Sequence, residues 1–76
     1  MLTIRFWGVT SDVSGLRHTQ FPLVRTAGQL RKKLEENYPG LSKWYYLLLV
    51  NGEKPGEQDL LRKDDRVDLI PPFAGG

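Results

Sequence analysis

The sequence ends in VDLIPPFAGG, residues 67–76, and this stretch constrains the fold more than any other. Its first four residues are apolar apart from one aspartate, and they predict a last β-strand. The two prolines that follow lack the N–H that a sheet ladder needs, and they fix φ at an extended value. The strand is therefore expected to stop at Ile70, and residues 71–76 to leave the sheet as a thin tail.

The first strand is predicted at residues 3–9, where apolar and polar residues alternate. Leu2, Ile4 and Phe6 would lie on one face, and Trp7 on the other. Gly8 is expected to mark a bulge or a close approach. The first and last strands could pair in parallel in the middle of the sheet, with a helix in the crossover. That topology would project the tail from the end of a central strand.

A hairpin is predicted to follow the first strand. Residues 10–15 are rich in turn formers and predict its loop. Residues 16–23 would return as a second strand at the sheet edge, because Pro22 cannot donate to a ladder.

An amphipathic helix of about three turns is predicted next. Thr26 and Gln29 match a capping box, and apolar residues recur at helical spacing through Leu34 and Tyr38. The helix is expected to close at residues 37–40, which include a proline and a glycine.

Residues 44–50 are strongly apolar and predict a further strand, which ends at the turn signal Asn51-Gly52. A turn is predicted at residues 63–66, before the last strand. The order β-β-α-β-(short strand or turn)-β predicts an α+β fold, a mixed sheet with one main helix across one face. The expected organisation is a domain at residues 1–70 and a flexible tail at 71–76.

The composition is that of one small globular domain, with 76 residues, 39% apolar and 26% charged. The absence of cysteine excludes disulfides, cysteine-bound zinc and thiol nucleophiles. No apolar run could span a bilayer and no signal peptide is evident, so we expect a cytoplasmic protein without a membrane partner. Residues 1–43 hold seven Lys/Arg against three Asp/Glu, and residues 44–76 four against six. This asymmetry could orient a charged partner protein.

Side chains arranged for catalysis are not evident. The single histidine, His18, stands in a polar segment and is interpreted as an exposed structural residue. No metal-ligand set or phosphate-binding glycine loop is seen. The run at residues 31–33 is basic but lacks an aromatic platform, so no nucleic-acid partner is expected.

The tail is the segment that could carry chemistry. Phe73 is an apolar anchor beyond the last strand, and Ala74, Gly75 and Gly76 have almost no width. Six extended residues reach roughly 20 Å, far enough to enter a narrow channel in another protein. Adenylation by ATP would make the terminal carboxylate an electrophile for a sulfur or amine nucleophile. The alternative is an end with no role, since chain ends usually fray.

The pattern of a strand, Pro-Pro, an aromatic, a small residue and Gly-Gly resembles the C-terminus of the small subunit of molybdopterin synthase, the MoaD family. Residues 50–52 resemble the Val-Asn-Gly step that this family and its thiamine-pathway relatives carry. Residues 3–8 resemble its first strand, with an aromatic at the position of Trp7. The resemblance covers the whole chain and implies a ubiquitin-like β-grasp fold.

The resemblance also implies a sulfur carrier, a subunit without catalytic side chains or bound cofactor. A ubiquitin-activating-type enzyme would adenylate Gly76 with ATP, and a sulfur donor protein would convert it to a thiocarboxylate. The tail would then enter the large subunit of molybdopterin synthase, where its sulfur helps to form the dithiolene of molybdopterin. Gly75 and Ala74 would let the tail thread. The residues implied to contact partners are Phe73, Pro72, Pro71, Trp7, Leu60 and Leu61.

Three alternatives stay open. A thiamine-pathway carrier also ends in Gly-Gly but usually lacks the double proline. A ubiquitin-like modifier would be joined to lysines through Gly76, and its activation begins in the same way. A passive β-grasp interaction module would leave the tail unused.

Overall fold

A computed structural model describes residues 1–72, so the predicted roles of Phe73, Ala74, Gly75 and Gly76 lie outside the described residues. In chain order the elements are β1 (Leu2–Phe6), α1 (Val9–Ser14), β2 (His18–Phe21), α2 (Ala27–Asn37), the 3-10 helix η1 (Pro39–Lys43), β3 (Leu47–Val50) and β4 (Arg66–Ile70). The predicted order of strands and main helix is confirmed, and α1 and η1 are additions to it.

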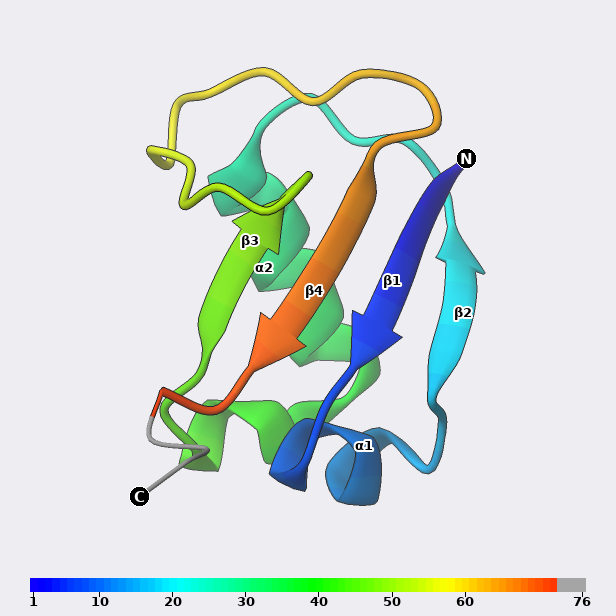
Figure 1. Cartoon of the computed structure of the whole chain (residues 1–76), viewed down its shortest axis with the longest axis vertical. Coiled ribbons are helices and arrows are strands. Elements are labelled where there is room, and N and C mark those ends of the chain that lie inside the picture. Colours follow the sequence, from blue (N-terminus) through cyan, green and yellow to red (C-terminus); the bar gives the residue numbers. More distant parts are fainter. Residues whose placement is uncertain (73–76) are drawn as a thin grey trace.

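The four strands form one mixed sheet in the order β2-β1-β4-β3 (Figure 1). β1 and β4 lie in the centre and run parallel, with Ile4 opposite Val67 and Phe6 opposite Leu69. The two edge strands pair antiparallel with their neighbours. The predicted parallel pairing of the first and last strands is therefore confirmed.

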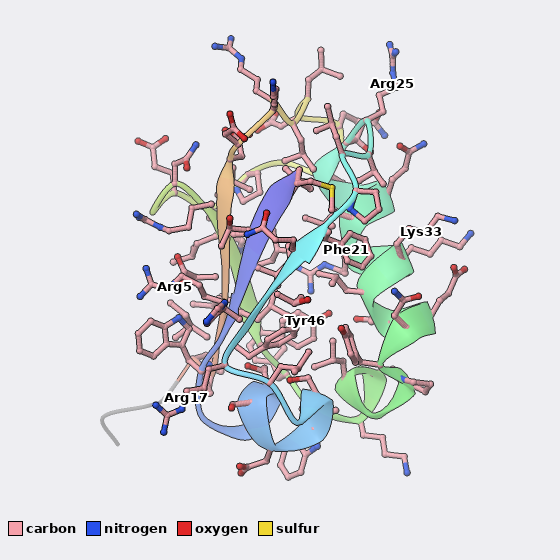
Figure 2. All side chains as sticks on the ribbon, turned by 90° about the vertical axis from the view of Figure 1, so that its right-hand side faces the viewer. Arg5, Arg17, Phe21, Arg25, Lys33 and Tyr46 are labelled. Carbon is pink, nitrogen blue, oxygen red and sulfur yellow. The ribbon has the colours of Figure 1, made fainter. Side chains whose placement is uncertain are left out.

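The helix α2 covers one face of the sheet, and the core lies between them (Figure 2). Along β1 the residues alternate between buried and half-buried, as the sequence pattern predicted. The inward side chains pack with those of α2, and the fully buried ones include Leu2, Ile4, Leu30, Leu34 and Leu69. Among residues 1–72 no helix covers the opposite face of the sheet, so the exposed side chains on that face are open to solvent or a partner.

The helix α2 begins and ends where the sequence predicted. The Thr26 hydroxyl accepts a hydrogen bond from the Gln29 N–H at 3.2 Å, which satisfies one of the free donors of the first turn. The Gln29 side chain accepts from the Arg25 N–H at 3.2 Å, one residue earlier than in a standard capping box. The helix ends at Asn37, and the chain turns directly into η1.

The prediction of a loop at residues 10–15 was wrong, because the helix α1 occupies most of it. Thr10 is fully buried, and its hydroxyl accepts from the Trp7 N–H at 2.8 Å. The same oxygen lies 2.7 and 3.0 Å from the carbonyl oxygens of Trp7 and Leu69. Gly15 ends the helix in the left-handed conformation, at φ 76°. Residues 10–14, which were predicted as turn formers, therefore make up most of a short helix, and Gly15 ends it.

Three predicted strands are shorter than expected. The first covers Leu2–Phe6 rather than residues 3–9, because the chain turns at Gly8 and α1 begins at Val9. The second covers His18–Phe21 rather than residues 16–23, because Ser11 and Ser14 hydroxyls bond the Leu16 carbonyl before the strand begins. The third covers Leu47–Val50 rather than residues 44–50. Trp44 closes η1 instead, through its N–H to the Leu41 carbonyl.

The predicted turn at Asn51-Gly52 is present, with φ of 51° and 87° at the two residues. It does not join β3 directly to β4. The chain first forms an isolated bridge between Val50 and Glu53, and residues 54–65 then cross the end of the sheet (Figure 1). The Asn51 side chain bonds the Asp65 carboxylate and the Arg66 N–H, which fixes the start of β4.

Thr10→Val is expected to lower the free energy of unfolding by about 1–3 kcal/mol, because it removes a buried hydroxyl from its partners at nearly unchanged shape. Urea denaturation followed by circular dichroism measures the change. The matched control is Thr3→Val on the uncovered sheet face, expected within about 0.5 kcal/mol of the parent. Equal losses in the two variants would show that the Thr10 hydroxyl does not hold α1 to the sheet.

Candidate functional site

The parallel central strands end at the same edge of the sheet, where the tail begins (Figure 1). The Trp7 N–H donates to the Leu69 carbonyl at 3.1 Å, so the pairing of β1 with β4 continues one residue beyond Phe6. Pro71 is half-buried and Pro72 is exposed. The base of the tail therefore lies directly beside the end of β1.

Gly8 makes the close approach that the sequence suggested. Its φ is 55° and its ψ is −128°, a conformation that residues with a side chain rarely adopt. A Cβ atom at this position would lie 3.0 Å from the Pro71 Cγ. Glycine is thus required both by the backbone turn after β1 and by the proline that packs against it.

Asp68 organises the uncovered face of the sheet beside the tail. Its Oδ1 accepts from the Trp7 Nε1–H at 2.8 Å and lies 3.3 Å from the Arg5 Nε. Its Oδ2 lies 3.5 Å from the Arg66 Nε. The Arg5 guanidinium also lies 4.9 Å from the centre of the Trp7 ring. Trp7 is 44% exposed, but the hydrogen bond from its indole N–H to Asp68 holds the ring, so it presents a fixed aromatic surface.

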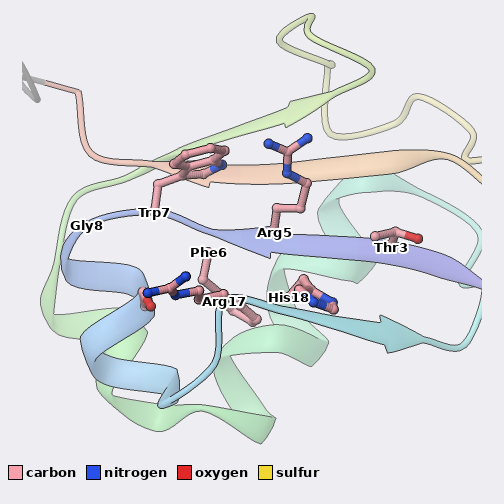
Figure 3. A pocket seen from close by; sticks show the side chains of 8 residues that line it. Thr3, Arg5, Phe6, Trp7, Gly8, Arg17 and His18 are labelled. Carbon is pink, nitrogen blue, oxygen red and sulfur yellow. The ribbon is translucent and has the colours of Figure 1, made fainter.

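A hollow of about 510 Å³ lies between this cluster and the start of β2 (Figure 3). Arg5 and Trp7 rise from the same side of β1, while Arg17 and His18 come from the chain that enters β2. The lining is basic and aromatic and contains no carboxylate; it consists of Thr3, Arg5, Phe6, Trp7, Gly8, Ser11, Arg17 and His18. The hollow is therefore suited to a group with negative charge.

The structure brings some of the predicted contact residues together and separates others. Trp7, Pro71 and Pro72 lie at one end of the sheet. Leu60 is 65% exposed but forms a bridge with Thr26 at the other end, where α2 begins. Leu61 is 8% exposed and belongs to the hydrophobic core, so it supports the surface rather than offering a side chain to a partner.

Sequence reasoning missed Asp68, Arg5 and Arg17 as surface determinants. Asp68 could have been found, because a lone charge in an otherwise apolar last strand points to a specific partner on the strand's outer side. Its partners Trp7 and Arg5 could not have been found from the sequence, because they depend on the register of β1 against β4. Arg17 became part of the site only because α1 returns the chain to the end of β1.

Tyr46, outside this region, has a pKa that its packing explains. Burial raises the pKa of Tyr46, and the nearby Glu35 carboxylate, which accepts from its hydroxyl at 2.6 Å, raises it further. The Arg31 guanidinium lies over the same ring at 5.0 Å. Within residues 1–72 no group of three or more His, Asp or Glu side chains could hold a metal ion. In the same residues, no helix is long and apolar enough to cross a membrane.

Comparison with known proteins places these features in a family. The model of the ThiS family matches residues 4–76, nearly the whole sequence. The chain belongs to the ThiS family. No curated protein sequence matches this ThiS-family chain significantly.

Solved structures similar to this ThiS-family chain share its complete fold. A Pyrococcus furiosus protein described as molybdopterin converting factor, subunit 1, matches with a TM-score of 0.82 at 13% identity, covering 95% of this chain and 97% of that one. SAMP1 from Haloferax volcanii matches with a TM-score of 0.78 at 22% identity, covering 99% and 98%. A chain of the Amycolatopsis orientalis BexX/CysO complex matches with 0.80 at 16% identity, covering 100% of both. The predicted ubiquitin-like β-grasp fold, shared by sulfur carriers and modifiers, is confirmed.

Gly8→Ala is expected to destabilise this ThiS-family chain by about 1–3 kcal/mol, since alanine must adopt a strained backbone and its Cβ meets Pro71. The control is Gly15→Ala, which has a positive φ but nothing within 4 Å of the added Cβ, and it should cost about 1 kcal/mol. Thermal unfolding of both variants is repeated in a Pro71→Ala background. The comparison separates the cost of the backbone conformation at Gly8 from the cost of the close contact with Pro71. The cost at Gly8 should fall in that background, and an unchanged cost would disprove a role for the contact in placing the tail.

Proposed function

We propose that this chain is a sulfur carrier whose C-terminal Gly76 is adenylated and converted to a thiocarboxylate, as the small subunit of molybdopterin synthase. The observation that carries the proposal is the exit of the chain from the sheet. A central strand of a ThiS-family β-grasp domain ends at Ile70, packs Pro71 against Gly8, and continues into Pro72-Phe73-Ala74-Gly75-Gly76. The match to the family model runs through this last residue.

The chemistry needs no side chain of this protein. A carboxylate oxygen of Gly76 attacks the α-phosphorus of ATP and pyrophosphate leaves, which gives an acyl-adenylate. Hydrosulfide delivered by a donor protein then attacks the carbonyl carbon, AMP departs with the electrons of the broken C–O bond, and loss of the S–H proton leaves the thiocarboxylate. The product carries sulfur in place of one carboxylate oxygen. Both steps take place in the active site of the adenylating enzyme, so the carrier must deliver a narrow end to that site.

The described residues support this division of labour. Pro71 and Pro72 have no N–H to extend the ladder, and the last strand ends at Ile70. The base of the tail is fixed by its contact with Gly8. Trp7 is held beside it by Asp68, as a surface for the large subunit or the adenylating enzyme. Leu60, at the other end, would be a separate contact.

A second candidate is a protein modifier, in which a lysine amine rather than sulfur attacks the acyl-adenylate or a thioester derived from it. The structural likeness to SAMP1, solved for Methanosarcina acetivorans as small archaeal modifier protein 1, favours keeping this candidate. The double proline favours the molybdopterin-type carrier over the thiamine-type carrier. Activation of Gly76 is common to all three, so it is the step to test first.

The proposed activation predicts a mass change. Incubation with the ubiquitin-activating-type enzyme of the same organism, ATP and a sulfur donor should raise the intact mass by the difference between sulfur and oxygen. A variant lacking Gly76 should show no gain. An unchanged mass, with the enzyme shown to be competent on another carrier, would contradict the sulfur-carrier proposal and leave the modifier and the passive interaction module.

Gly75→Val is expected to leave the folded domain intact and to abolish adenylation, because a branched side chain would widen the part of the tail that threads into the enzyme. Pyrophosphate exchange measures adenylation, and circular dichroism measures folding. The matched control is Gly56→Val in the loop at the other end, where an added Cβ meets Asp59 only at ordinary contact distance. This variant should be adenylated at the parent rate. Normal adenylation of Gly75→Val would refute the narrow channel.

The molecule that reacts with the activated C-terminus distinguishes the molybdopterin role from protein modification. The thiocarboxylate form, mixed with the large subunit of molybdopterin synthase and precursor Z, should lose its sulfur and return to the carboxylate mass as dithiolene forms. Lysine conjugates in place of that loss would favour the modifier.

A further inference from the structure

The uncovered face of the sheet carries more positive charge than its own carboxylate neutralises. Within residues 1–72 the ion pairs join Arg5 and Arg66 to the single carboxylate of Asp68. Arg17 is exposed on the same side and takes part in neither pair. Two guanidinium groups thus share one carboxylate, and Arg17 adds a further positive charge at the hollow, so the local charge is positive.

The Arg5 guanidinium is positioned to receive a ligand. Its Nε faces Asp68 Oδ1 and its plane lies near the Trp7 ring, so the side chain is held from two directions. The terminal nitrogens remain for an external acceptor, and a guanidinium matches a carboxylate in a two-point geometry. Arg17 lies across the hollow from the strand that presents Arg5 (Figure 3). Two such groups would accommodate two carboxylates of one ligand.

We propose that this hollow binds an acidic segment of the enzyme that adenylates Gly76, through two or more Asp or Glu side chains. The inference rests on the proposed function, because that function supplies a protein that must engage the tail. The hollow includes Gly8, against which Pro71 packs, so a protein that receives the tail passes over it. Charge complementarity here would orient the carrier before the tail enters and would speed association.

The make-up of the hollow favours a peptide segment over a small free anion. The lining combines basic groups with the exposed ring of Trp7 and the largely buried Phe6, which suits carboxylates carried on a chain with apolar parts. The hollow is open rather than enclosing, and one arginine comes from β1 while the other comes from the chain that enters β2 (Figure 3).

The basic residues on the helix side serve as the internal comparison. Arg25 and Lys33 project from the side of the molecule opposite Arg5 and Arg17 (Figure 2). Lys33 lies on α2, two and three residues before Glu35 and Glu36, and Arg25 precedes that helix. Arg25 therefore gives a control with the same charge change at a distance from the tail.

The first test is the kinetics of adenylation with Arg17→Glu and Arg25→Glu, using the adenylating enzyme of the same organism. Arg17→Glu should raise KM for the carrier roughly tenfold at unchanged kcat, and the difference should shrink as salt screens the charges. Arg25→Glu should stay within about twofold of the parent. Equal effects of the two variants, or a fall in kcat alone, would overturn the proposal.

The second test needs no enzyme, so it separates failure of this inference from failure of the proposed function. The ¹⁵N-labelled full chain is titrated with a hexaglutamate peptide blocked at both ends, and in parallel with inorganic phosphate. The Trp7 indole N–H, which bonds Asp68, is the reporter, and the exposed Trp44 indole at the end of η1 is the control. A peptide-induced shift at Trp7 alone, lost in Arg17→Glu, supports the proposal. No shift, or an equal response to phosphate, refutes it.

Discussion

The parallel pairing of β1 with β4 is the constraint on which the rest of the molecule depends. Two parallel neighbours end at the same edge, so the chain that follows β1 and the chain that follows β4 must emerge together. This places Trp7 beside residues that lie 61 positions later in the sequence. It also requires glycine at position 8, because a side chain in the turn after β1 would meet Pro71. A tail that left from an edge strand would have no such support.

The same pairing explains why a carboxylate is tolerated in the middle of the sheet. Asp68 alternates with the buried Val67 and Leu69, so its side chain belongs to the face that no helix covers. It is only 7% exposed, because Trp7 and the arginines of neighbouring positions close over it. A buried charge needs partners, and these partners are available only in this register. Asp68 therefore holds the Trp7 ring and the guanidinium groups of Arg5 and Arg66 in place near the base of the tail.

The sequence predicted the elements with strong local signals and missed those that depend on distant contacts. The capping residues around Thr26, the strand alternation of β1 and the proline stop after Ile70 are local, and all are seen. The helix α1 was missed because Ser, Asp and Gly favour turns and helix ends alike, and Thr10 decides between them through bonds to Trp7 and Leu69. Leu61 was grouped with Leu60 because adjacent apolar residues in a loop give no sign of which one is buried.

Small size also determines where specificity can lie. A chain of 76 residues buries a single small core, which leaves little room for a deep substrate cavity. If the terminal glycine is activated as proposed, the reacting atoms are backbone atoms, which are the same in every carrier that ends in Gly-Gly. Discrimination among adenylating enzymes and acceptors must then come from side chains near the base of the tail. Arg5, Trp7 and Asp68 meet that requirement, because they are held by one another and lie where a receiving protein must pass.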